Sequence, residues 1–220
     1  MDSLLIQTVA VYAIPVLFAI TLHEAAHGYA ARHFGDNTAA VLGRLSLNPL
    51  RHIDLLGTVA MPLLLYFMTD GKFVFGYAKP VPVDSRNLRR PKQDMLWVAF
   101  AGPASNLVMA LFWAVVAIAL GAAGIDEQFF QGVVRAGVLV NLVMAALNLF
   151  PLPPLDGGRM LVAVLPYAQA VTLSRVEPFG FFVVLLLAAT NLLNYWMTPL
   201  ITGMEVALRL LLRPLLFLFS

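Results

Sequence analysis

The residues best suited to chemistry form one short cluster, His23-Glu24-Ala25-Ala26-His27, inside an apolar stretch that begins at Leu4. Two histidines four residues apart share one face of a helix, and the glutamate beside them turns toward the same site. Imidazole nitrogens are common zinc ligands, and a carboxylate placed there can take a proton from water. The spacing therefore predicts that His23 and His27 hold one Zn²⁺ ion per chain and that Glu24 acts as a general base.

A zinc site of this kind needs a third protein ligand and keeps a fourth position for water. The best candidate is Asp156, which follows an apolar helix and lies between prolines and glycines in the segment 148–158. When the helices are threaded alternately across a membrane, Asp156 emerges on the same face as the histidines. An ionisable group at membrane depth is costly unless it is paired, and a shared metal ion provides that partner. We therefore expect Asp156 to complete the site.

The composition indicates a membrane protein. Of the 220 residues, 60% are hydrophobic and 12% are charged, with a mean hydropathy of +0.84, whereas soluble domains carry about 25% charged residues. The net charge of +2 does not predict nucleic-acid binding, because the basic residues stand between apolar segments as topology signals do. Cysteine is absent, which excludes disulfides and thiolate ligands. The first apolar segment lacks a basic region before it, so we expect it to be retained rather than cleaved as a signal peptide.

Apolar helices must position these residues in the lipid bilayer. Five are expected, at 4–34, 95–120, 133–150, 179–196 and 203–219. A shorter apolar stretch at 55–68 suits a re-entrant segment better than a full crossing. Residues 73–83 alternate in polarity between prolines and predict short β-strands on the cytoplasmic side. The sequence thus predicts an all-α polytopic membrane protein, a helical bundle of about five transmembrane helices, with 1–220 as a single membrane-embedded domain.

The distribution of charge predicts the orientation of this bundle. If 55–68 enters and leaves the membrane by one face, one side receives most basic residues, including four between 86 and 92, and the other receives the acidic pair at 126–127. The positive-inside rule makes the basic side cytoplasmic. The metal site is therefore expected near the cytoplasmic face of a multi-pass protein, in the cell (inner) membrane of a prokaryote.

Three blocks of the sequence resemble the site-2 protease family of intramembrane zinc metalloproteases, in its small subfamily without a PDZ domain. They are HExxH at 23–27, GPxxN at 102–106 and NxxPxPxLDG at 148–157. The matching region covers a core of about 4–159 and leaves the C-terminal helices at about 179–219 outside.

The resemblance implies a role for each residue of the cluster. It implies that His23, His27 and Asp156 bind zinc, that Glu24 is the base, and that Asn148 positions or polarises the substrate peptide. It also implies hydrolysis of a peptide bond within or next to a transmembrane helix of another membrane protein.

Two other functions use the same residues. A divalent-metal transporter would use His23, His27 and Asp156 as a transit site, because intramembrane ionisable residues also mark ion pathways. Such a carrier needs neither Glu24 nor Asn148. A silent binding protein that holds membrane helices would need no base. The presence of the base together with all three ligands favours the protease.

Overall fold

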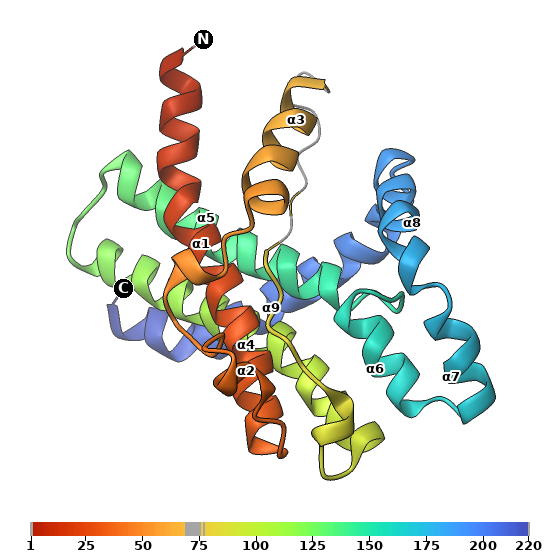
Figure 1. Cartoon of the computed structure of the whole chain (residues 1–220). Coiled ribbons are helices and arrows are strands. Elements are labelled where there is room, and N and C mark those ends of the chain that lie inside the picture. The colour runs from red at the N-terminus through yellow and green to blue at the C-terminus, as the bar shows by residue number, and fades with distance from the viewer. Residues whose placement is uncertain (1, 69–75, 77, 220) are drawn as a thin grey trace.

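The structure is a computed structural model that describes residues 2–68, 76 and 78–219, and this part of the chain is built almost entirely from helices (Figure 1). The labels η mark short 3₁₀ or π turns. In chain order the elements are α1 (Asp2–His33), α2 (Thr38–Val41), η1 (Pro49–Arg51), η2 (Leu55–Ala60), α3 (Met61–Met68), η3 (Ser85–Asn87), α4 (Pro91–Ala122), α5 (Gln128–Asn148), α6 (Asp156–Val164), α7 (Tyr167–Ser174), α8 (Glu177–Ala189) and α9 (Asn194–Phe219).

Helix α4 is the centre of the bundle. It packs against α1, α5, α6 and α9, and α1 also packs against α5. Small residues make these contacts close, as is common between membrane helices. Ala99 and Ala110 are buried on α4, and a Cβ added at Gly137 of α5 would lie 2.3 Å from the ring of Trp113. The backbones of α1, α4 and α5 can therefore approach closely around the predicted site.

Among the residues that the structure describes, three helices are long and apolar enough to cross a membrane, namely Ile6–His33, Pro91–Ala122 and Gln128–Asn148. They confirm the helices expected at 4–34, 95–120 and 133–150. A fourth crossing is reached only if α7 and α8, which are bent by 66° at a short break, count as one. The chain is thus an integral membrane protein of helical architecture.

The prediction of one helix over 179–196 is wrong. Helix α8 ends at Ala189, Asn191 adopts a positive φ of 58°, and α9 begins at Asn194. Asparagine tolerates this left-handed conformation better than most residues, so a turn forms inside an apolar run. Helix α9 therefore begins nine residues before the predicted 203 and carries charges at 205, 209 and 213. Their spacing of four places them along one side of the helix, which distinguishes α9 from a uniformly apolar span.

Residues 55–68 form η2 and α3 with the predicted bounds. Asp54 begins this element by accepting hydrogen bonds from the backbone N–H groups of Leu56 and Gly57.

The predicted β-strands at 73–83 are absent from the described part of that range. Residues 73–75 and 77 lie outside the described residues, and residues 76 and 78–83 form no strand. Pro80 and Pro82 have no N–H to donate to a ladder. The backbone N–H groups beside these prolines are also not available to a strand. That of Lys79 donates to the carbonyl of His52, and that of Val81 donates to the Glu24 side chain of α1.

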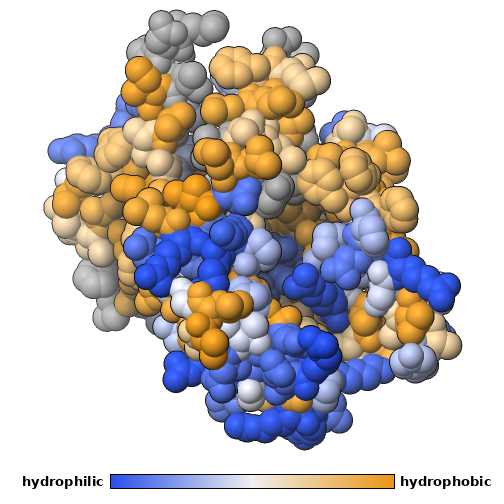
Figure 2. All heavy atoms as spheres, viewed as in Figure 1, coloured by the Kyte–Doolittle hydropathy of each residue, from blue (hydrophilic) through white to orange (hydrophobic). Residues whose placement is uncertain are grey.

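Polar and apolar residues separate along the molecule. Figure 2 shows hydrophilic side chains gathered at the lower end, which in the matching view of Figure 1 holds the end of α1, α2, the start of α4, and α6 and α7. The opposite end, with α3 and α8, is mostly hydrophobic on this face.

Candidate metal centre

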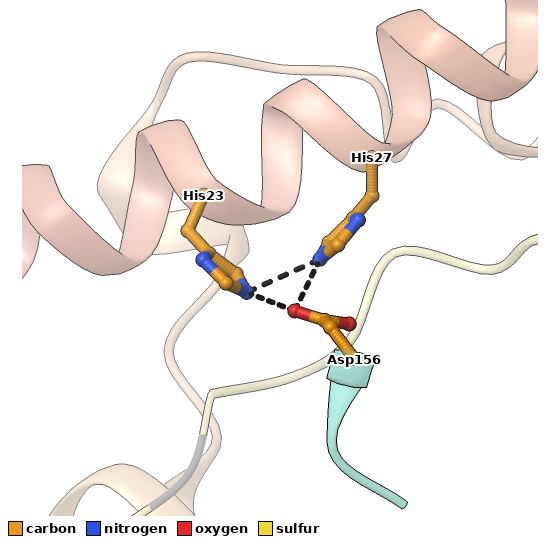
Figure 3. A group of neighbouring side chains, drawn as sticks. All are labelled: His23, His27 and Asp156. Carbon is orange, nitrogen blue, oxygen red and sulfur yellow. Dashed lines mark hydrogen bonds and ion pairs between the residues drawn. The ribbon is translucent and has the colours of Figure 1, made fainter. Parts of the chain in front are cut away.

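The predicted metal ligands meet at one point. His23 and His27 lie one turn apart on α1, Asp156 is the first residue of α6, and their side chains point toward one another (Figure 3). Oδ2 of Asp156 lies 3.2 Å from Nε2 of His23 and 3.3 Å from Nε2 of His27. The two Nε2 atoms are 3.1 Å apart. All three side chains are buried.

A hydrogen bond at Nδ1 of each imidazole determines which ring nitrogen carries the proton. Nδ1 of His27 lies 2.7 Å from the carbonyl oxygen of Val98, and Nδ1 of His23 lies 2.6 Å from Oδ1 of Asn106. Both oxygens can only accept, so each Nδ1 is the donor. In a neutral ring, Nε2 then presents a lone pair. Both Nε2 lone pairs point toward Asp156.

When both rings are neutral, three electron-pair donors thus converge without a proton between them. Oδ2 of Asp156 is buried and has no hydrogen-bond partner among the described residues. Acceptor atoms held this close repel one another unless a cation lies among them, and buried polar atoms are otherwise paired. Two imidazole nitrogens and one carboxylate oxygen form a ligand set used by catalytic zinc sites. The residues therefore fit a zinc ion.

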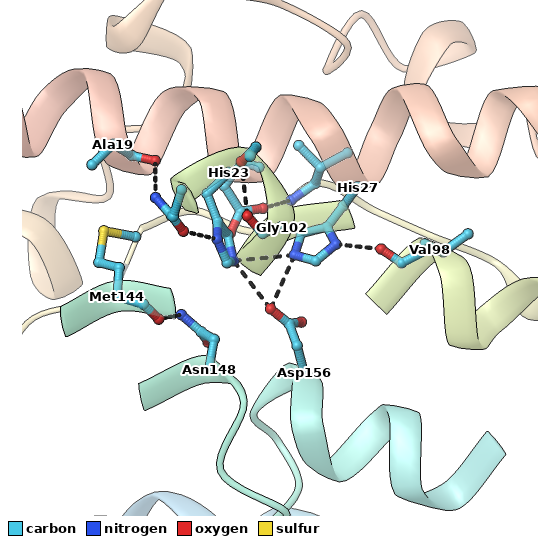
Figure 4. A network of polar contacts seen from close by, with 12 residues as sticks. Ala19, His23, His27, Val98, Gly102, Met144, Asn148 and Asp156 are labelled. Carbon is cyan, nitrogen blue, oxygen red and sulfur yellow. Dashed lines mark hydrogen bonds and ion pairs between the residues drawn. The ribbon is translucent and has the colours of Figure 1, made fainter. Parts of the chain in front are cut away.

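Asn106 is itself held by a second amide. Its Nδ2 donates to the carbonyl of Ala19, at 3.3 Å, and to Oδ1 of Asn141, at 2.9 Å. Nδ2 of Asn141 donates in turn to the carbonyl of Gly137, at 2.8 Å. Nδ2 of Asn106 and Nδ2 of Asn141 both face acceptors, which determines the orientation of each side-chain amide. Oδ1 of Asn106 therefore faces His23. Part of this network is drawn in Figure 4.

Helix α4 meets both imidazoles through one face. Val98, Gly102 and Asn106 are spaced by four and so lie in one row. A Cβ added at Gly102 would lie 2.4 Å from Nε2 of His27 and 2.6 Å from Cε1 of His23. The position therefore requires glycine.

These supporting residues were not assigned roles by the sequence reasoning. Gly102 and Asn106 belong to the GPxxN block, which supported the family resemblance but gave neither residue a predicted role. A usable signal was present, because Asn106 and Asn141 are polar residues within otherwise apolar helices, where an amide needs a partner.

The backbone around α6 places Asp156. Gly157 and Gly158 lie directly against the end of α5 and the loop that follows it. A Cβ at Gly157 would lie 2.3 Å from the carbonyl oxygen of Leu149, and one at Gly158 would lie 2.1 Å from the nitrogen of Pro153. Two glycines after the aspartate thus let the start of α6 press against the loop, which carries the carboxylate to the histidines.

Glu24 faces the same site but makes a different contact. Its Oε2 accepts the backbone N–H of Val81 at 2.7 Å. Prolines precede and follow Val81, so it alone among residues 80–82 has an N–H to give. The contact ties the segment 78–83 to the middle of α1 and orients the Glu24 carboxylate.

A cavity of about 360 Å³ joins these groups. Its mostly apolar wall includes all five predicted site residues, His23, Glu24, His27, Asn148 and Asp156. Nδ2 of Asn148 donates to the carbonyl of Met144, at 3.0 Å, one turn earlier on α5 (Figure 4). One of the two amide hydrogens is thereby used within the helix.

Comparison with known proteins gives a consistent result. A model of peptidase family M50 matches residues 122–190. The chain is 35% identical over 199 residues to a protein of Bacillus subtilis (strain 168) named "Putative zinc metalloprotease YwhC", an alignment that covers 86% of this chain and 85% of the relative. It is 30% identical over 188 residues to the similarly named Rip2 of Mycolicibacterium smegmatis, covering 84% and 69%. No solved structure matches.

Proposed function

The chain belongs to peptidase family M50, the site-2 protease family of intramembrane zinc metalloproteases, and we propose on that premise that it cuts a transmembrane-helix protein in or beside its membrane span. The observation that carries this proposal is the convergence of the Nε2 atoms of two histidines on a buried carboxylate, with Glu24 beside them in the same cavity. Neither the family nor the names of the relatives favours the metal transporter.

The proposed roles follow from the positions of the side chains. His23, His27 and Asp156 would hold one zinc ion, which when bound supplies a Lewis acid that polarises a carbonyl group and makes water more acidic. Glu24 stands beside the ligands in the cavity and accepts the proton of the attacking water. It then returns that proton to the amine of the leaving peptide. Asn148, on the cavity wall, donates its remaining amide hydrogen to the substrate backbone.

A transmembrane helix cannot be cut while its carbonyl groups are hydrogen-bonded, so the substrate must unwind locally. The wall formed by Ala78, Pro80, Val81 and Val83 supports an extended peptide, because this segment is itself without helix and lines the cavity. The unwound stretch of the substrate lies extended along this wall. This placement brings the scissile bond next to Glu24.

The proposed membrane is the cell membrane of a prokaryote, with the site near its cytoplasmic face. The hydrophilic end of the molecule in Figure 2 contains the basic residues at 86–92, and the positive-inside rule places such an end in the cytoplasm. The chain enters the membrane with residues 55–68 and returns to that same face by Lys79, whose N–H donates to the carbonyl of His52. The length of 55–68, 14 residues, is below the roughly 20 needed for a full crossing.

The proposal is tested with the variant Glu24→Gln. We expect it to keep its zinc, because the metal ligands are intact, and to lose at least about a hundredfold in proteolysis. Proteomics of membrane fractions from cells that carry the wild type or the variant would identify the helices that accumulate uncut. Purified wild type and variant, reconstituted with such a helix, then give the rates. Undiminished cleavage by a zinc-loaded Glu24→Gln variant would refute the role of Glu24.

A further inference from the structure

A second, larger hollow adjoins the metal-site cavity. It encloses about 950 Å³ and shares five wall residues with that cavity, which are Pro80, Val81, Val83, Met95 and Arg159. The two spaces therefore adjoin one another along these five residues. We call the larger part the side groove.

The side groove leads toward the hydrophilic end of the molecule. One wall is formed by the segment 80–85 and the start of α4, and the other by α6, α7 and the start of α8. These elements surround the hydrophilic lower end in Figures 1 and 2. A peptide chain that leaves the metal site for water has this groove in its path.

The lining of the side groove combines an apolar floor with cations. The floor includes Val162, Ala163 and Val171, whereas Lys92, Arg159 and Arg175 are basic and Glu177 is the one acidic residue among the lining residues. Positive charge therefore exceeds negative charge along the groove.

The one acid does not cancel this excess. Nη2 of Arg159 lies 3.7 Å from Oε1 of Glu177, and both side chains are about half exposed. Nζ of Lys92 donates to the carbonyl of Leu165, a neutral group, so Lys92 keeps its charge. Arg175 is exposed at the end of α7. The groove is thus complementary to a peptide that carries both apolar and acidic side chains.

We propose that the side groove binds the stretch of the substrate that continues from the cleaved bond into the aqueous phase, and that it selects acidic side chains in that stretch. The inference rests on the proposed function for the position of the cleaved bond. Arg159, which lines both spaces, stands where the peptide passes from the metal site into the groove. Lys92 and Arg175 then contact acidic residues further along.

The test measures binding without hydrolysis. The full chain carrying Glu24→Gln is purified in a nonionic detergent, and a fluorescein-labelled octapeptide alternating glutamate with leucine is titrated by anisotropy. Octapeptides with glutamine or lysine in place of glutamate are measured in parallel. We expect the glutamate peptide to bind most tightly, and Arg175→Glu to weaken it by roughly threefold to tenfold while strengthening the lysine peptide.

The matched control is Arg213→Glu, which makes the same change of charge at an exposed arginine of α9 outside both cavities. It should leave all three affinities unchanged. Equal effects of the two charge reversals would show diffuse attraction to a basic surface and overturn the proposal, as would equal binding of the glutamate and glutamine peptides. Because no bond is cut, selective binding by a protein that proves inactive would reject the proposed function and leave the groove assignment standing.

Discussion

Nδ1 of His23 lies 2.6 Å from Oδ1 of Asn106, so an amide on α4 determines which nitrogen of a ring on α1 faces the metal site. The amide is locked in its turn by Ala19 and Asn141. Groups that orient metal-binding histidines contribute to metal affinity without touching the ion.

Replacing Asn106 by leucine should weaken zinc binding by roughly 10-fold to 100-fold, because His23 loses the acceptor that holds its proton on Nδ1. Asn106→Asp keeps an acceptor at the same place and should bind zinc more tightly than Asn106→Leu. Competition with a chelating dye measures both affinities. Equal zinc affinities for wild type and Asn106→Leu would show that the hydrogen bond does not orient the ring.

Gly102→Ala should abolish tight zinc binding, since the added Cβ would lie 2.4 Å from Nε2 of His27 and must displace the ring. A suitable control on the same helix is Gly121→Ala, where a Cβ would have no neighbour within 4 Å. That control should bind zinc normally and gain slightly in stability through better helix propensity. Zinc content after dialysis, with circular dichroism as a check of folding, distinguishes the two.

Val81→Pro removes the only N–H that the segment 80–82 can offer to Glu24. A hydrogen bond to a charged group contributes about 1.5–3 kcal/mol, so we expect kcat to fall by roughly tenfold or more while zinc binding is retained. Val81→Ala keeps the N–H and loses only side-chain packing, and it should remain much closer to wild type. A loss of activity that is the same in both variants would assign the effect to packing.

Asp36 joins the end of α1 to the segment before α4. Its carboxylate accepts from Thr38, from the backbone of Asp84 at 2.7 Å and from Nδ2 of Asn87 at 3.2 Å. Burial raises the pKa of Asp36, but these hydrogen bonds outweigh it and hold the pKa below its ordinary value.

The lowered pKa of Asp36 gives a stability effect with a definite sign. The stabilisation is fully present above the unfolded pKa of about 3.9 and is lost as pH falls through the lower folded value. Asp36→Asn should therefore unfold at a lower temperature than wild type at pH 7, and the difference should shrink in acid below about pH 4. Thermal unfolding in detergent at several pH values measures this, and a gap that widens in acid would contradict it.

The sequence predicted the parts of the site that have chemical signatures. His23, Glu24 and His27 identify themselves by spacing, and Asp156 by its position after an apolar helix beside glycines. Helices α1, α4 and α5 were also predictable, because a long apolar run in lipid has few alternatives to helix. Even the ends of the 55–68 element follow from Asp54 and the polar residues after it.

What the sequence left open depends on contacts between distant segments. The break at Asn191 lies between two apolar segments, where the polar residues Thr190, Asn191 and Asn194 are compatible with a helix as well as with a turn. The residues 78–83 alternate as strands do, but their one central donor is taken by Glu24 rather than by a neighbouring strand. Helices α6 and α7 are short and follow from the packing of α6 on α4 and of α7 on α6. No local pattern contains that information.

Val98, Gly102 and Asn106 form a row along α4 that engages both imidazole rings of α1. A slide of α4 by one residue, or a modest rotation, would break every one of these contacts at once. These contacts therefore hold α1 and α4 in one fixed register around the metal site. Under the proposed function, the opening that admits a substrate helix is made by parts outside this pair, such as α3 and α8.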